Sequence, residues 1–152
     1  MNLQIIKAKP NPSGKDRIKN FAPQYQLAGE WVDIKNFSNQ PMNLTHVKLY
    51  HWAYKLPKPD WEIVTGFQGT LPAGKVVRVH TGQKTSLSEI RPEDLLGADF
   101  HIFSGKGYLW NNDKEDKPML WDTNIKEYID KTSYDAYPLE GKILNRISNK
   151  LI

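Results

Sequence analysis

The stretch Glu30-Trp31-Val32-Asp33-Ile34-Lys35 decides the fold class of this 152-residue sequence. In it the apolar residues Val32 and Ile34 alternate with the charged residues Asp33 and Lys35. Successive side chains of a β-strand point to opposite faces of the sheet, so the alternation predicts a strand with one apolar and one polar face. We therefore expect a half-buried strand whose apolar face contributes to a core.

Short apolar patterns of the same kind recur on both sides of this stretch, separated by Pro, Gly, Asn or Asp residues. Many short strands with frequent turns are typical of an antiparallel β-sandwich or barrel. A proline and two acids at Pro92-Glu93-Asp94 favour one short helix near residues 92–97. The strands are predicted at residues 3–7, 30–35, 44–54, 61–64, 75–80, 100–103, 108–110, 119–121 and 125–129.

Composition limits both the domain organisation and the chemistry. No linker or internal repeat divides the chain, so we expect one domain over residues 1–141, followed at residues 142–152 by a final strand or a loosely held tail. Without cysteine the chain has no disulfide bond, thiolate metal site or thiol nucleophile. The sequence lacks an apolar run long enough to span a bilayer, and residues 1–7 lack the apolar core of a secretory signal. We expect a cytoplasmic protein, unless a signal peptide has been removed.

Basic residues are concentrated near the two ends of the chain, although the net charge is only +4. Lys15, Arg17 and Lys19 form the densest group, with Asp16 as the one acid among them. Such a group can contact the phosphates of a nucleic acid, or it can simply be a solvated terminal segment. These three residues are our basic candidates for a binding surface.

An aromatic row is the second candidate surface. Alternation along the strand places Tyr50, Trp52 and Tyr54 on one face and Leu49 on the other, and Trp61 opens the next strand. If Leu49 is in the core, these rings lie on the outside of the sheet, where aromatic rings can stack on sugars or on unpaired bases. The alternative is that they pack beneath the loop at residues 55–59.

Signatures of catalysis and of metal binding are weak. The sequence contains no Gly-x-Ser-x-Gly motif and no phosphate-cradling glycine loop. Its four histidines do not form the close pairs that are typical of zinc sites. Residues 111–116 are rich in Asn and Asp, which suits either a calcium site or a plain hairpin turn. We expect no enzymatic activity, no metal site and no cofactor.

Three stretches, taken in order, resemble the lamin tail domain, the immunoglobulin-like module of nuclear lamins that also occurs in many bacterial proteins. The resemblance spans most of the chain, and Trp110-Asn111-Asn112-Asp113 is its most specific part. The sequence departs from the family at His46-Val47, where the family often has Gly-Trp, and in the hairpin at residues 113–118, which lacks the usual glycine. The matching stretches are residues 30–36 with 42–44, residues 71–74 through 79–82, and residues 109–113 through 120–122.

This resemblance implies an all-β, immunoglobulin-like antiparallel sandwich of seven to nine strands, of the bacterial type, without catalytic residues. It also implies partners that are proteins or nucleic acid in the eukaryotic relatives. We therefore expect a non-catalytic interaction module that binds a protein partner or mediates assembly. Nucleic-acid binding through the basic ends and aromatic rings is one alternative, and carbohydrate or cell-envelope binding through the same rings is another.

Overall fold

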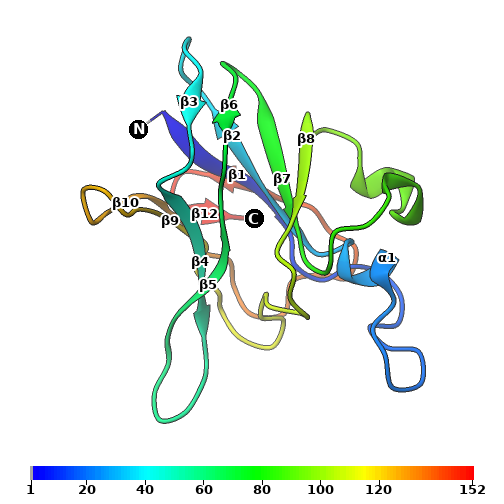
Figure 1. Ribbon diagram of the computed structural model, residues 1–152. Coiled ribbons are helices and arrows are strands. Elements are labelled where there is room, and N and C mark those ends of the chain that lie inside the picture. The colour runs from blue at the N-terminus through cyan, green and yellow to red at the C-terminus, as the bar shows by residue number, and fades with distance from the viewer. Residues whose placement is uncertain (1) are drawn as a thin grey trace.

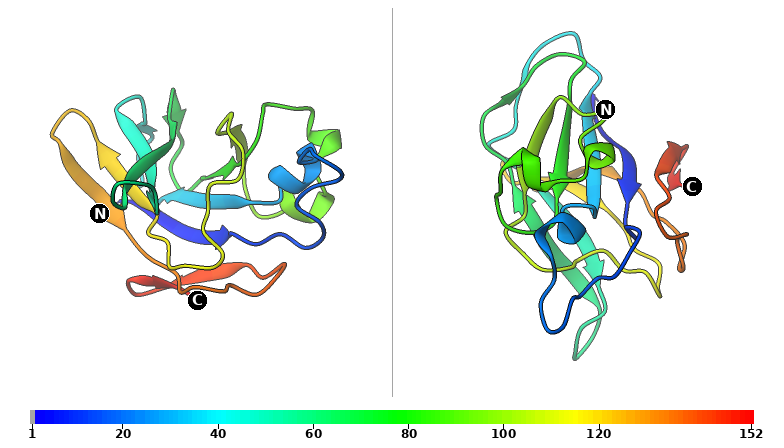
Figure 2. Two further views of the ribbon diagram at one scale, coloured as in Figure 1. Left: turned by 90° about the horizontal axis from the view of Figure 1, so that it is seen from below. Right: turned by 90° about the vertical axis from the view of Figure 1, so that its right-hand side faces the viewer.

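Two main β-sheets pack face to face in the computed structural model, which describes residues 2–152 (Figures 1 and 2). The strand order is β12-β11-β1-β2-β7-β8 in the six-stranded sheet and β10-β9-β4-β5 in the four-stranded sheet, and β3 pairs with β6. The predicted all-β sandwich is therefore confirmed, although β7 and β8 pair in parallel and not antiparallel as expected. The strands are β1 (Leu3–Lys9), β2 (Trp31–Asn36), β3 (Met42–Asn43), β4 (Val47–Ala53), β5 (Asp60–Gly66), β6 (Thr70–Leu71), β7 (Val76–His80), β8 (Phe100–Phe103), β9 (Met119–Asp122), β10 (Glu127–Lys131), β11 (Leu144–Ile147) and β12 (Lys150–Leu151).

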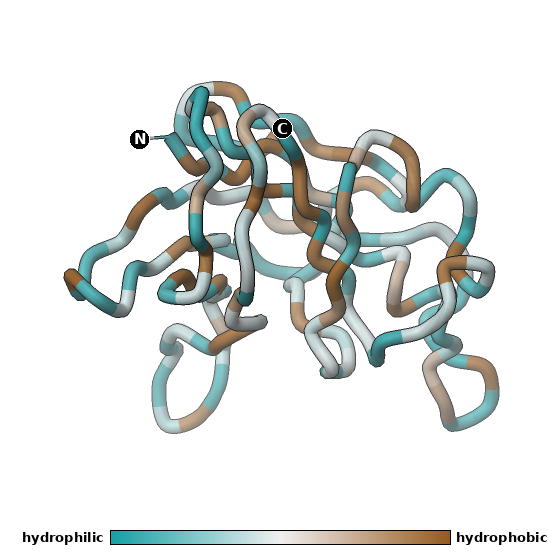
Figure 3. The backbone as a smooth tube through the Cα atoms, turned by 45° about the horizontal axis from the view of Figure 1, so that its top comes forward, coloured by the Kyte–Doolittle hydropathy of each residue, from teal (hydrophilic) through white to brown (hydrophobic). Residues whose placement is uncertain are grey.

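The core lies between the two sheets and is built from every second residue of the strands. Val32 and Ile34 of β2 are fully buried there, and Leu49 of β4 faces them from the other sheet. Hydrophobic and hydrophilic residues alternate along the chain in the strands (Figure 3). Packing between the sheets removes most of the surface of these apolar side chains from water. The resulting hydrophobic effect is the main force that holds the sheets together.

The prediction that β2 is half-buried was wrong. Asp33, on the face of β2 that points away from the core, is as completely buried as Val32. The reason is tertiary: the segment at residues 84–99 and the short helix α1 (Gln24–Leu27) cover the outer face of the six-stranded sheet. Alternation along one strand carries no information about which distant segment lies over it.

The helical elements differ from the expectation in detail. Near residues 92–97 the chain forms a 3-10 turn, Pro92–Asp94, preceded by a second 3-10 turn, Leu87–Glu89. Helix α1 lies in a region that we expected to be a loop, and residues 108–110 are not a strand. Among residues 2–152, no helix has the length and apolar character that crossing a membrane requires.

The end of the chain belongs to the sandwich. β11 pairs with β1, and β12 pairs with β11, so residues 142–152 form strands and not a loose tail. Arg146 of β11 then reaches the four-stranded sheet, where it donates two hydrogen bonds to Asp130 of β10 at 2.8 and 2.9 Å. This ion pair closes one lateral side of the sandwich. On the other side the edge strands β5 and β8 do not pair with each other.

Candidate binding site on the four-stranded sheet

Aromatic side chains gather on the outer face of the four-stranded sheet. The strand register places Trp52 beside Trp61 across β4 and β5, and Trp121 beside Tyr128 across β10 and β9. Tyr50 lies on the same face of β4 as Trp52, because the two are separated by one residue. We call these five residues the aromatic face.

Of the four aromatic residues that the sequence singled out, the structure brings Trp52 and Trp61 into contact. Leu49 is fully buried on the core side of β4, as the alternation required, and Trp52 and Trp61 meet edge to face with their ring centroids 5.1 Å apart. Tyr54 follows the end of β4, is 42% exposed, and donates a hydrogen bond from its hydroxyl to the Glu115 carbonyl at 3.0 Å. The rings therefore lie on the outer surface, partly exposed.

The basic candidates Lys15, Arg17 and Lys19 lie elsewhere. They belong to an exposed loop between β1 and α1. Figure 1 and the left view of Figure 2 both show this loop on the opposite side of the molecule from the β4–β5 hairpin. The basic group and the aromatic row are thus two separate surfaces.

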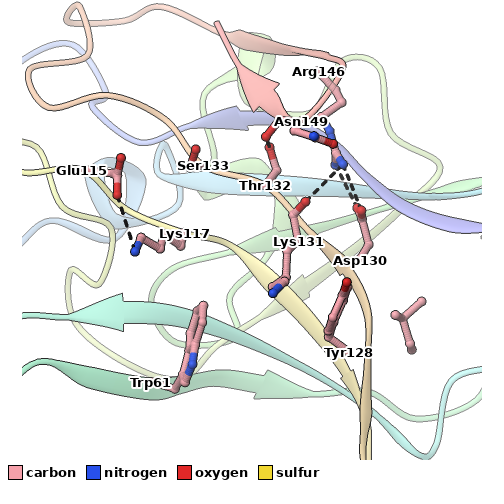
Figure 4. A pocket seen from close by; sticks show the side chains of 11 residues that line it. Trp61, Glu115, Lys117, Tyr128, Asp130, Lys131, Thr132, Ser133, Arg146 and Asn149 are labelled. Atoms are coloured by element: carbon pink, nitrogen blue, oxygen red, sulfur yellow. Dashed lines mark hydrogen bonds and ion pairs between the residues drawn. The ribbon is translucent and has the colours of Figure 1, made fainter.

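A cleft of about 550 Å³ lies where the start of β5, the end of β10 and the β11–β12 hairpin meet. Trp61 and Tyr128 lie on either side of it, and the Lys131 ammonium points into the space between them (Figure 4). Side chains from four separate segments contribute to it. The lining residues are Trp61, Glu115, Lys117, Tyr128, Ile129, Asp130, Lys131, Thr132, Ser133, Arg146 and Asn149.

Most of the charge in the cleft is already paired. Asp130 accepts both hydrogen bonds from Arg146 and a third from the Ile5 backbone N–H at 2.8 Å. The Lys117 ammonium lies 3.6 Å from the Glu115 carboxylate. Lys131 has no acidic partner within the described chain, and its ammonium lies 4.0 Å from the centroid of the Tyr128 ring. One positive charge is therefore available to a ligand.

Two neutral polar groups in the cleft are also available. The Ser133 hydroxyl and the Asn149 side-chain amide form no hydrogen bond with any residue that the structure describes. The Thr132 hydroxyl, by contrast, donates to the Asn149 carbonyl at 3.0 Å. A hydroxyl and an amide can each both donate and accept, so the cleft can bind a ligand that carries several hydroxyl groups.

The wall of the cleft at residues 111–117 is fixed by Asp116, whose side chain is fully buried. Its Oδ1 accepts hydrogen bonds from the backbone N–H groups of Trp52 and Lys117 at 2.8 and 2.7 Å. Its Oδ2 accepts from the backbone and side-chain N–H groups of Asn111 at 3.0 and 2.9 Å. Both oxygens are occupied by N–H donors, which favours the hairpin-turn interpretation of residues 111–116 over a calcium site.

His51 links this wall to β5. Its Nδ1 lies 3.0 Å from Asp116 and its Nε2 lies 3.1 Å from Glu62. Burial lowers the pKa of His51, but the hydrogen bonds and charges of the two carboxylates outweigh burial and raise the pKa above its ordinary value of 6.5. Neither ring nitrogen is left free to act as a base toward a nucleophile, so the arrangement is a structural link.

The outer face of the six-stranded sheet contains a buried polar layer. Arg78 donates two hydrogen bonds to Asp33 at 2.7 and 2.8 Å, and its guanidinium stacks 3.5 Å above the Trp31 ring. Asp94 accepts hydrogen bonds from Lys9 at 2.6 Å and from the Trp31 indole at 2.9 Å. These contacts attach the covering segment to the sheet, which explains why charged residues are tolerated there.

Burial shifts the pKa values of two further groups, His80 and Glu30. His80 Nε2 lies 2.8 Å from His101 Nδ1, and burial lowers the pKa of His80 to about 4. Glu30 accepts hydrogen bonds from the Thr81 hydroxyl and the Leu109 backbone N–H, and burial raises its pKa to about 7. Among residues 2–152, no three His, Asp or Glu side chains are close enough together to hold a metal ion.

A second, mainly apolar cleft of about 360 Å³ opens between the edge strands β5 and β8. The Lys106 ammonium donates to the Ile63 carbonyl on β5. Phe100 on β8 is 45% exposed. The lining residues are Leu44, Thr65, Gly66, Phe67, Gln68, Thr70, Leu71, Val77, Phe100, Ile102 and Phe103.

Several cleft residues were not among the sequence-derived candidates. Tyr128 had a detectable signal, since it is an aromatic residue inside the strand predicted at residues 125–129. Lys131, Ser133 and Asn149 had none, because a single lysine, serine or asparagine is ordinary on a surface. Only the pairing of β10 with β9 and of β11 with β1 brings these segments to the same cleft.

Comparison with known proteins adds no family. No protein-family model matches the chain, and no curated protein matches it.

Proposed function

We propose that this chain is a non-catalytic binding module that binds carbohydrate in the cleft on its aromatic face. The observation that carries the proposal is the cleft in which Trp61 and Tyr128 flank side chains with free hydrogen-bonding groups. A sugar ring has the complementary chemistry, because its C–H faces pack against aromatic rings and its hydroxyl groups exchange hydrogen bonds with polar side chains. The volume of about 550 Å³ lies within the usual range for small-ligand sites.

The absence of catalysis is part of the proposal. Glycoside hydrolysis needs two carboxyl groups that face the bond to be cleaved. In the cleft, Asp130 is held by Arg146 and by the Ile5 N–H, and Glu115 lies beside Lys117. The commitment of both carboxylates to internal partners favours binding over bond cleavage.

A panel of soluble polysaccharides in affinity electrophoresis, combined with titration of tryptophan fluorescence, tests this proposal. We expect at least one polysaccharide to retard the protein, and Trp61→Ala and Tyr128→Ala each to reduce that retardation at least tenfold. Phe37→Ala is the matched control, because Phe37 is 51% exposed and lies outside the aromatic face. If no polysaccharide is bound, or if Phe37→Ala weakens binding as much as Trp61→Ala, the proposal is wrong.

A protein partner is the second candidate, and the apolar cleft between β5 and β8 favours it. Both strands are sheet edges, and β8 carries no Lys, Asp, Glu or Pro, the residues that commonly protect an edge from pairing. An extended peptide with alternating apolar side chains would pair with β8 and fill the cleft. This mode would supply the assembly contacts that the resemblance to lamin tail domains implies.

Site-specific crosslinking in the source cells distinguishes this second candidate. A photo-reactive residue at Gln68, which lines the cleft and is exposed, is expected to give a discrete adduct. The same group at Gln40, exposed in the turn after β2, is the control. Equal labelling from both positions, or none from Gln68, would exclude strand addition at this edge.

Nucleic acid is the partner with the weakest support. The basic group that the sequence singled out, Lys15, Arg17 and Lys19, is on a loop remote from the aromatic face, so it does not extend the track of a strand stacked on these rings. Nucleic acid would become the best supported partner if the affinity for oligonucleotides fell steeply with rising salt concentration and binding were lost when these three residues were replaced by Gln.

A further inference from the structure

We propose that the cleft selects sugars that carry a carboxylate, such as uronic acids. This inference rests on the proposed function, since it names the class of carbohydrate that the same site takes. It starts from the charges that line the cleft, where three cationic side chains face two acidic ones. Arg146 is paired with Asp130 and Lys117 with Glu115, which leaves Lys131.

The position of Lys131 suits a ligand carboxylate. Its backbone is held in β10 by pairing with Met119, and its carbonyl accepts a hydrogen bond from Arg146 at 3.2 Å. Its ammonium has three N–H donors, and the Tyr128 ring lies against only one side of it. Figure 4 shows the ammonium nitrogen between Trp61 and Tyr128, so its other donors are open to a ligand in the cleft.

A sugar acid satisfies the groups in the cleft together. Its carboxylate meets the Lys131 ammonium, its ring packs against Trp61 or Tyr128, and its hydroxyl groups reach Ser133 and Asn149. A neutral sugar leaves the ammonium without a partner. Charge-assisted hydrogen bonds are about twice as strong as neutral ones, so the carboxylate decides the preference.

The same charges disfavour a densely charged polyanion. Asp130 and Glu115 line the cleft, and Arg146 and Lys117 neutralise these two carboxylates without adding a net positive charge. A polymer with more than one charge per residue, such as a heavily sulfated glycan or a nucleic acid, brings extra negative charge close to these carboxylates. One unpaired ammonium matches one carboxylate for each sugar.

Binding of the full chain to four polymers tests the inference: polygalacturonate, a neutral galactan, dextran sulfate and single-stranded DNA. We expect polygalacturonate to bind at least tenfold more tightly than the other three at physiological salt. Lys131→Gln is expected to remove most of this preference, and Lys131→Arg to retain it. Lys84→Gln, which removes an exposed charge from the segment over the other sheet, is expected to change nothing.

The outcomes separate this inference from the proposed function. If galactan binds as tightly as polygalacturonate, the selectivity is wrong and carbohydrate binding stands. If dextran sulfate or DNA binds at least as tightly as polygalacturonate, or if Lys84→Gln acts like Lys131→Gln, general attraction to polyanions replaces the proposed site. If no polysaccharide binds, both proposals are wrong.

Discussion

The outer faces of the two sheets differ in whether another segment of the chain covers them. On the six-stranded sheet, Asp33, Arg78 and Asp94 form a polar layer that residues 84–99 seal from water. On the four-stranded sheet, Trp61 and Tyr128 remain partly exposed beside an open cleft. Charged groups are buried where the chain covers its own sheet, and large aromatic rings are exposed where it does not.

This contrast identifies the face that is available for binding. A buried ion pair whose hydrogen bonds are made inside the chain leaves nothing for a ligand. Exposed aromatic rings with unpaired polar groups between them leave both apolar surface and hydrogen bonds for a partner. Substitutions on the covered face are therefore expected to change stability, and substitutions on the aromatic face to change binding.

The largest expected effect comes from Arg78→Ala on the covered face. This change leaves Asp33 buried without its partner and frees the carbonyl groups of Asp94 and Leu96, so we expect a loss of about 3–5 kcal/mol in the free energy of unfolding. Urea denaturation measures it. Lys75→Ala is the control, because its pair with Asp99 at 3.9 Å is exposed, and it is expected to cost less than about 0.5 kcal/mol. Equal losses would show that the covered face is not sealed.

Glu30 extends the comparison to a buried carboxyl group just before β2. Because burial raises its folded-state pKa from 4.5 to about 7, the folded protein holds the proton more tightly than the unfolded chain, and stability falls as pH rises through that interval. Glu30→Gln removes this dependence. The free energy of unfolding of the variant minus that of the wild type is expected to increase by about 3 kcal/mol as the pH rises from 4 to 8. A pH-independent difference in urea denaturation would contradict the raised pKa.

His51 tests whether the wall of the cleft is held from inside. Its raised pKa means that the protonated ring stabilises the fold fully below pH 6.5, and that this contribution is lost as pH rises through the folded-state pKa. His51→Gln is therefore expected to destabilise the protein most at pH 6, by about 2 kcal/mol for the lost hydrogen bonds to Asp116 and Glu62, and less at pH 9. Thermal unfolding at the two pH values measures it. A larger cost at pH 9 would reverse the sign of the shift.

The smallest expected effect on stability comes from the aromatic face itself. Tyr128 is 53% exposed, so Tyr128→Ala is expected to change the free energy of unfolding by less than about 0.5 kcal/mol. The same variant is expected to lose carbohydrate binding. If Tyr128→Ala unfolds the domain instead, the ring belongs to the core and the contrast between the two faces fails.

Period-two alternation predicted most of the fold. It placed Val32 and Ile34 on the core face of their strand, and both are buried there, as is Leu49 on the face opposite the aromatic row. It failed where a covering segment intervenes, since nothing near Asp33 in the sequence shows that residues 84–99 lie over it. It also missed α1, because a single helical turn is too short to show a period.

The sequence predicted the outward-facing aromatic rings of the candidate site but not the other residues of the cleft. Alternation correctly placed Tyr50 and Trp52 on the outside of the sheet, because side-chain direction along a strand is local geometry. It gave no reason to connect these rings with Lys131, or to separate them from Lys15. Such distances depend on which strands pair.

By itself, the sequence determined the β-sandwich class, the inner and outer faces of the main strands, and the absence of cysteine chemistry, because each follows from residue types and spacings a few positions apart. Only the tertiary structure decided which outer face is covered and which side chains share the cleft. Those outcomes depend on strand order and on contacts between residues more than a hundred positions apart, such as Ile5 with Asp130, and local pattern carries no information about them.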